Sequence, residues 1–101
     1  MAEKALNYLK STDTTAATTR AYCQLLDDQK KTILADQYIK SDGSQGDRLK
    51  HAESSEEYKQ HLKKLHDSIY DWELIKNKRK SAELQIEIWR SQNANMRRGN
   101  I

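Results

Sequence analysis

The sequence contains no proline, no phenylalanine, only three glycines and a single cysteine among its 101 residues. Proline and glycine are the residues that most often interrupt helices, so their scarcity leaves almost nothing to break one. The lone Cys23 excludes an intramolecular disulfide bond and favours a cytoplasmic setting. No apolar run approaches the roughly 18 residues that cross a membrane, and the N-terminus lacks the apolar core of a signal peptide. We therefore predict a cytoplasmic protein with no membrane partner.

Apolar residues are also in short supply. Hydrophobic residues make up 36% of the chain and charged residues 33%. A compact core is marginal at this length, whereas helices that share a narrow apolar seam suit such a composition. Disorder is the competing interpretation of high charge. Two tryptophans, five tyrosines and many leucines and isoleucines recur at helical spacing, however, and this favours a folded all-α protein of one domain.

The stretch from Ser54 to Arg98 contains no proline and no glycine. Ser54 and Glu57 form a capping-box pattern, so we expect one long helix over residues 54–98. Its first half places apolar residues at alternating steps of four and three: Tyr58, Leu62, Leu65, Ile69 and Trp72. The pattern LQIEIW at 84–89 alternates with period two, so a strand is the alternative there. We favour helix because the flanking residues are strong helix formers.

Two amphipathic segments and a loop precede the long helix. We expect a short helix over residues 2–10 and a second helix over 13–40, separated by the capping residues STDTT at 11–15. Two glycines among serines and aspartates predict a loop over 41–53, in which Gly43 suits a left-handed position. This loop reverses the chain. The predicted fold is therefore a long, coiled-coil-like antiparallel helical hairpin with a short N-terminal helix.

The lengths of the helices leave residues 82–98 without a partner in the hairpin. The basic tract KNKRK at 76–80 interrupts the apolar seam, and apolar residues return after it in a changed phase. Either the N-terminal helix or a second copy of the chain covers this segment, and in the second case the protein is a homo-oligomer. In the first case the residues expected to meet are Leu6, Tyr8 and Leu9 on one side and Ile86, Ile88 and Trp89 on the other.

No set of residues typical of an active site occurs in the sequence. His61 and His66 are five residues apart, so they do not share a face of a helix, and His51 lies in the predicted loop. Neither an HExxH motif nor a Cys–His zinc pattern is present. Cys23 has no histidine within four residues, which favours packing over nucleophilic chemistry. We predict a protein that is not an enzyme and has no catalytic residue, metal ligand or cofactor.

Basic residues are concentrated near the C-terminus. The formal net charge is +3, yet residues 76–101 carry seven basic and only two acidic residues. The basic residues are candidates for contact with nucleic acid or another partner: Lys76, Lys78, Arg79, Lys80, Arg90, Arg97 and Arg98. Tyr70, Trp72 and Trp89 are aromatic residues able to stack on exposed bases. The alternative is that the tryptophans are buried and the cations are solvated.

Several short patterns occur from Ser54 onward, and LNYL occurs at 6–9. They are Ser55-Glu56-Glu57-Tyr58, Leu74-x-x-Asn77-Lys78-Arg79, Ala82-Glu83-Leu84, Trp89-Arg90 and Arg97-Arg98-Gly99. In these patterns, which span most of the chain, the sequence resembles a group of small helical proteins of tailed bacteriophages, often encoded near replication and recombination genes. The resemblance implies a phage setting, the cytoplasm of the host cell and a role near DNA metabolism. It carries no activity, so no functional residue is transferred.

Three functions remain open at this point. The first is a non-enzymatic phage accessory protein that contacts nucleic acid or a DNA-processing complex through its basic C-terminal half. The second is an inhibitor or adaptor that binds a host or phage protein. The third is a structural component of the virion.

Overall fold

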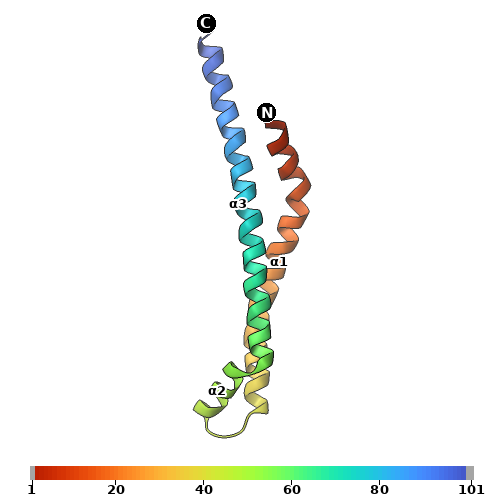
Figure 1. The fold of residues 1–101 in the computed structure, drawn as a ribbon, viewed down its shortest axis with the longest axis vertical. Coiled ribbons are helices and arrows are strands. Elements are labelled where there is room, and N and C mark those ends of the chain that lie inside the picture. The colour runs from red at the N-terminus through yellow and green to blue at the C-terminus, as the bar shows by residue number, and fades with distance from the viewer. Residues whose placement is uncertain (1, 100–101) are drawn as a thin grey trace. The chain divides into compact units, whose positions relative to one another are not determined.

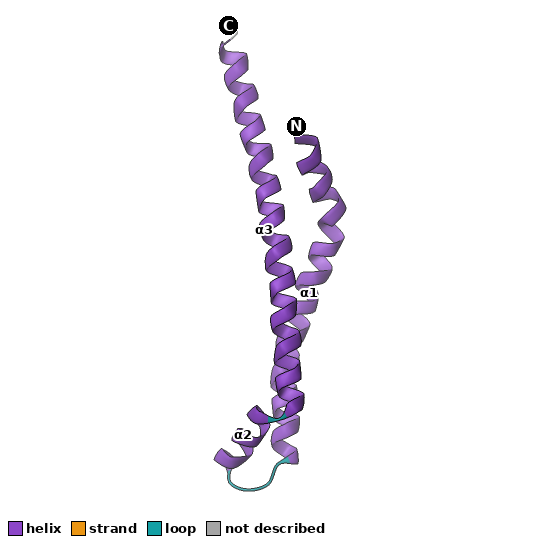
Figure 2. Cartoon of the chain, in the orientation of Figure 1, coloured by secondary structure: helices purple, strands orange, loops and turns teal. Residues whose placement is uncertain are grey.

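The computed structural model describes residues 2–99 and contains three helices and no strand within that range (Figure 1; Figure 2). Helix α1 is Ala2–Lys40, α2 is Gln45–Ser54 and α3 is Glu56–Gly99. The predicted all-α class is confirmed. None of the described helices is both long enough and apolar enough to cross a membrane.

The chain forms two compact units, each of which contains part of α1 and part of α3. Unit 1 combines the residues up to Thr18 with those from Glu73 onward, and unit 2 is Thr19–Trp72, which includes α2. Within each unit, the two long helices run antiparallel, so the predicted helical hairpin is confirmed. The neighbouring pairs that establish the direction are Leu6 with Ile86 and Leu9 with Arg79 in unit 1, and Cys23 with Ser68 and Leu26 with His61 in unit 2.

Residues 11–15 continue α1 and do not separate two helices. The Thr12 hydroxyl donates a hydrogen bond to the Tyr8 carbonyl oxygen at 2.6 Å, four residues earlier. The hydroxyl thus bonds back into the preceding turn and does not cap a new helix. Threonine costs a helix only about 0.7 kcal/mol or less per residue, which does not break it without proline or glycine nearby. The predicted helices over 2–10 and 13–40 are therefore one helix, and the prediction of a separate N-terminal helix was wrong.

Most of the predicted loop over 41–53 is also helical, because it forms α2. Ser44 caps this helix, and its hydroxyl oxygen accepts a hydrogen bond from the Asp47 N–H at 3.2 Å. Ala52, near the other end of α2, has no exposed surface. Capping and burial thus stabilise a helix in a segment whose composition alone indicated a loop.

The connection between α1 and α2 is confined to residues 41–44. Gly43 has a φ angle of +108°, in the region that residues with a side chain rarely adopt, as its predicted left-handed role requires. The other glycine of the predicted loop, Gly46, lies in the first turn of α2, where it neither ends nor begins a helix. Only one of the two glycines therefore acts as a turn residue.

The long helix predicted over 54–98 begins at Glu56, and it remains helical through the LQIEIW pattern. The predicted cap, Ser54, is the last residue of α2. Ser55 caps α3 instead, and its hydroxyl oxygen accepts a hydrogen bond from the Tyr58 N–H at 3.3 Å. The cap is therefore one residue later than predicted, and the predicted capping box does not form, because the residue three positions after Ser55 is Tyr58 and not a glutamate.

The buried face of α3 in unit 2 includes two polar residues. His61 and Ser68 are 6% and 4% exposed, whereas Ile69, predicted to lie in the seam, is 41% exposed. The His61 Nε2 atom lies 2.6 Å from the Leu26 carbonyl oxygen. The Cys23 Sγ atom lies 2.8 Å from the Ser68 hydroxyl oxygen. These pairings compensate the cost of burying the polar groups, and small side chains let the helices approach closely.

Burial in unit 1 continues through the basic tract. Among the buried and half-buried residues of α3, one series follows steps of three and four through both units: His61, Leu65, Ser68 and Trp72 in unit 2, and Ile75, Arg79, Ala82 and Ile86 in unit 1. The predicted change of phase after Arg79 was therefore wrong, because Arg79 itself occupies a seam position. On α1, the buried residues of unit 1 are the small Ala5 and Ala16, at 3% and 7% exposure.

Candidate functional site

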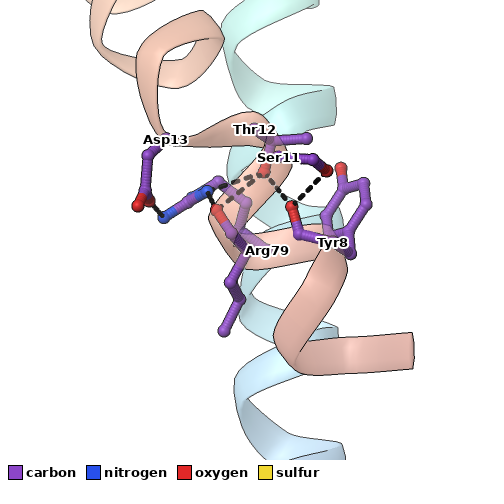
Figure 3. Close-up of polar contacts among 6 residues, drawn as sticks. Tyr8, Ser11, Thr12, Asp13 and Arg79 are labelled. Atoms are coloured by element: carbon purple, nitrogen blue, oxygen red, sulfur yellow. Dashed lines mark hydrogen bonds and ion pairs between the residues drawn. The ribbon is translucent and has the colours of Figure 1, made fainter. Parts of the chain in front are cut away.

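The predicted site residue Arg79 is part of the fold of unit 1 (Figure 3). Its guanidinium group reaches from α3 to α1 and donates hydrogen bonds to the Leu9 carbonyl oxygen at 2.9 Å and the Thr12 hydroxyl oxygen at 2.7 Å. It also forms an ion pair with Asp13. The Arg79 side chain is only 20% exposed. Its charge is therefore used within the chain and is a poor candidate for contact with phosphate.

Two further candidates are paired with glutamates of their own helix. The Lys76 Nζ atom lies 3.0 Å from the Glu73 carboxylate, and the Arg90 guanidinium lies 3.1 Å from the Glu87 carboxylate. All four side chains are about half exposed or more. Such pairs at helical spacing of three are weak and can exchange partners. They lower the local positive charge without removing the residues from the surface.

The remaining candidates, Lys78, Lys80, Arg97 and Arg98, are exposed and form no ion pair among the described residues. Lys78 lines a shallow groove of about 270 Å³ beside Lys4 of α1. The four cations do not form one row along α3, because Lys78 and Lys80 are two residues apart and Arg97 and Arg98 are adjacent, so neither pair shares a helix face. Unit 1 has nine basic and five acidic residues in its sequence, so its basic character is spread over several faces.

One aromatic candidate is covered within its unit. The Arg20 guanidinium lies 5.9 Å from the centre of the Trp72 ring, and Trp72 is half buried. A cation over the ring face competes with any stacked base. Tyr70 and Trp89 are exposed, at 67% and 43%.

An apolar groove lies in unit 1, between the start of α1 and α3. It has a volume of about 470 Å³ and is lined by Ala2, Glu3, Leu6, Ile86, Trp89 and Arg90. Its walls are mainly apolar, with the Glu3 carboxylate and the Arg90 guanidinium as the charged groups. Leu6 and Trp89 remain 45% and 43% exposed although they face the same groove. The surface can therefore accept a large apolar side chain from another molecule.

The residues that line this groove show which segment covers part of 82–98. Leu6, Ile86 and Trp89 meet in unit 1, as predicted for coverage by the N-terminal helix. Ile88 does not take part, since it is 57% exposed. Tyr8 and Leu9 meet other residues of α3, because Tyr8 lines a groove with Ala82 and the Leu9 carbonyl oxygen accepts a hydrogen bond from Arg79. The N-terminal turns of α1 thus cover one face of α3 between Ala82 and Arg90.

Some residues of these sites were not indicated by the sequence. Thr12 and Asp13 were expected to cap a helix, and instead they hold Arg79. Ala2 and Glu3 were not expected to line a groove. Spacings of three and four along α1 would have placed Thr12 on the same face as Leu9 and Ala16, and continuing the seam of α3 by the same steps would have reached Arg79.

No protein-family model, curated protein or solved structure matches this chain. The described residues also contain no cluster of three or more histidine, cysteine or carboxylate side chains able to hold a metal ion. The groove and the cations of unit 1 are therefore the features on which a function can be argued.

Proposed function

We propose that this protein is a non-enzymatic adaptor or inhibitor that binds another protein through the groove of unit 1. In the phage setting that the resemblance implies, the partner is a protein of a DNA-processing complex. The observation that carries the proposal is the pairing of an apolar groove with two half-exposed residues, Leu6 and Trp89, on its walls.

Two properties of the groove support a protein partner. Half-exposed tryptophan beside an aliphatic side chain is typical of the residues that contribute most to protein–protein binding. The charged groups, Glu3 and Arg90, have opposite signs, which suits the mixed polar rim of such an interface and gives phosphate no net attraction there.

A capture experiment tests the adaptor. The tagged protein is incubated with lysate of infected and uninfected host cells, and retained proteins are identified by mass spectrometry. We expect one protein to be retained in near-stoichiometric amount by the wild type and lost with Leu6→Asp. The matched control is Tyr22→Asp, at an exposed position of unit 2 that is 49% exposed. Retention of the same protein by Leu6→Asp would contradict the proposal.

Contact with nucleic acid is the second candidate, supported by the adjacent exposed cations Arg97 and Arg98 in the last turn of α3. The test is fluorescence anisotropy with single- and double-stranded DNA at two salt concentrations. If phosphates are bound there, Arg97→Ala/Arg98→Ala should weaken binding and reduce the salt slope by about 1.5. The matched control, Lys63→Ala/Lys64→Ala, removes two exposed cations of unit 2. No binding at low salt, or equal losses in both variants, would exclude this candidate.

A further inference from the structure

A row of uncharged residues runs along α3 in unit 1, on the face turned away from α1. We call it the outer row. Its members follow steps of three and four and are all exposed: Leu74, Asn77, Ser81, Leu84, Ile88, Ser91 and Asn95. Each of the first five lies two residues after a buried or half-buried position of the seam, which places the row on the opposite side of the helix. The row is about 32 Å long at 1.5 Å per residue.

The composition of the outer row is unusual for such a position. The face of a helix opposite its packed seam normally carries the charged residues. Ten of the 27 residues from Glu73 to Gly99 are charged, yet none lies in the row. The row instead exposes three large apolar side chains: Leu74 at 42%, Leu84 at 55% and Ile88 at 57%. This spacing is that of a second helix-packing seam without a helix to cover it.

We infer that a second copy of this chain docks antiparallel on the outer row, with a two-fold axis at Leu84. Reversing the row about Leu84 brings large residues against small ones. Ile88 then faces the partner's Ser81, and Leu74 faces the partner's Asn95. Leu84 meets its own counterpart at the axis, which gives the self-complementary contact that a symmetric dimer needs.

The charges along one flank of the row support this partner and this direction. They are Glu73, Lys80 and Glu87, and Arg98 lies one step of three beyond the end of the row. In the antiparallel dimer, Lys80 lies near the partner's Glu87 and Glu73 near the partner's Arg98, and both pairs occur twice. A parallel dimer would bring this flank against the opposite flank of the partner, so it would not pair Lys80 with the partner's Glu87.

The existing ion pairs do not oppose this arrangement. Glu73 is paired with Lys76, and Glu87 with Arg90, within one helix and on an exposed surface. Exposed pairs of this kind contribute little to stability, so their carboxylates can turn toward a partner subunit at low cost. The inference is independent of the groove, since Leu6 and Trp89 are not members of the outer row.

Sedimentation equilibrium over a range of protein concentrations tests the dimer. The wild type should dimerise, and Leu84→Glu should weaken dimerisation at least about tenfold. The control, Ile39→Glu, introduces the same charge at a position of unit 2 that is 75% exposed and should dimerise like the wild type. Far-ultraviolet circular dichroism checks that both variants keep their helices. A wild type that remains monomeric, or a Leu84→Glu variant that matches the control, would overturn the inference.

Charge reversal tests the pairing across the interface. Lys80→Glu and Glu87→Lys should each dimerise more weakly than the wild type, because each places like charges together. An equimolar mixture of the two variants should form a heterodimer, in which both contacts are again between opposite charges. A mixture that associates no better than its components would contradict the assigned pairs.

Disulfide trapping tests the direction, in a Cys23→Ala background that removes the native thiol. Leu84→Cys should form a cross-linked dimer on mild oxidation, because the axis brings the two sulfur atoms together. Leu74→Cys should not, since its counterpart lies far along the partner helix. Equal cross-linking at both positions would indicate a parallel dimer and refute the antiparallel arrangement.

Discussion

Arg79 places a positive charge between two helices of unit 1, where backbone, hydroxyl and carboxylate oxygens surround it. A charge at a mostly buried position is costly unless it is paired and hydrogen-bonded. Here the acceptors come from one turn of α1, so the guanidinium fixes the position of α3 against that turn. Arg79 therefore acts as a bridge between α1 and α3.

Replacing Arg79 with alanine should destabilise the protein by about 2 kcal/mol, because several charge-assisted hydrogen bonds are lost together. Urea denaturation followed by circular dichroism measures the change. Arg90→Ala is the control, since Arg90 is 66% exposed and forms one exposed ion pair; it should cost less than about 0.5 kcal/mol. Equal losses in the two variants would show that Arg79 does not bridge the helices.

At the scale of the elements, the contact between α1 and α3 in unit 1 depends on small residues. Ala16 is 7% exposed, whereas its neighbour Ala17 is exposed. The small buried residues of unit 1, Ala5 and Ala16 on α1 and Ala82 on α3, let the backbones approach closely, so larger side chains at these positions would be overpacked.

Ala16→Leu should therefore destabilise the protein by about 1–3 kcal/mol through overpacking. Ala17→Leu adds the same atoms on the exposed side and should change stability by less than about 0.5 kcal/mol. Thermal unfolding of both variants gives the comparison. A stable Ala16→Leu protein would mean that the seam is looser than its burial indicates.

The two glycines around α2 should respond in opposite ways to alanine. Gly43→Ala should destabilise by at least about 1 kcal/mol, because its φ angle of +108° strains a side chain. Gly46→Ala should stabilise by roughly 0.5 kcal/mol, since it lies in α2 with no atom within 4 Å of an added Cβ. Urea denaturation of both variants measures these changes. If both substitutions raised or both lowered the free energy of unfolding, the different roles of the two glycines would be refuted.

At the scale of the whole molecule, the sequence predicts the all-α hairpin correctly. Helical periodicity and the lack of helix breakers indicate helices regardless of which side chains pack together. It fails at residues 11–15 and 41–53, where composition indicates caps and loops. There, Thr12 bonds back into its own helix and also accepts a hydrogen bond from Arg79 of α3, and Ala52 is buried. Tertiary contacts thus add to local bonds in overriding the composition. The candidate cations were predictable as a group. The sequence did not predict which of them, among the described residues, is buried, which are paired and which are free on the surface, because burial of Arg79 depends on where the seam of α1 lies.

The function of the molecule depends on whether unit 1 binds through its groove or through its charge. Calorimetric titration of the captured partner with the wild type, Trp89→Ala and Arg97→Ala/Arg98→Ala separates the two. We predict that Trp89→Ala raises Kd at least about thirtyfold, as expected for an interface tryptophan, and that the arginine variant changes it less than about threefold. A partner affinity that is unchanged by Trp89→Ala but lost with the arginines would contradict binding through the groove.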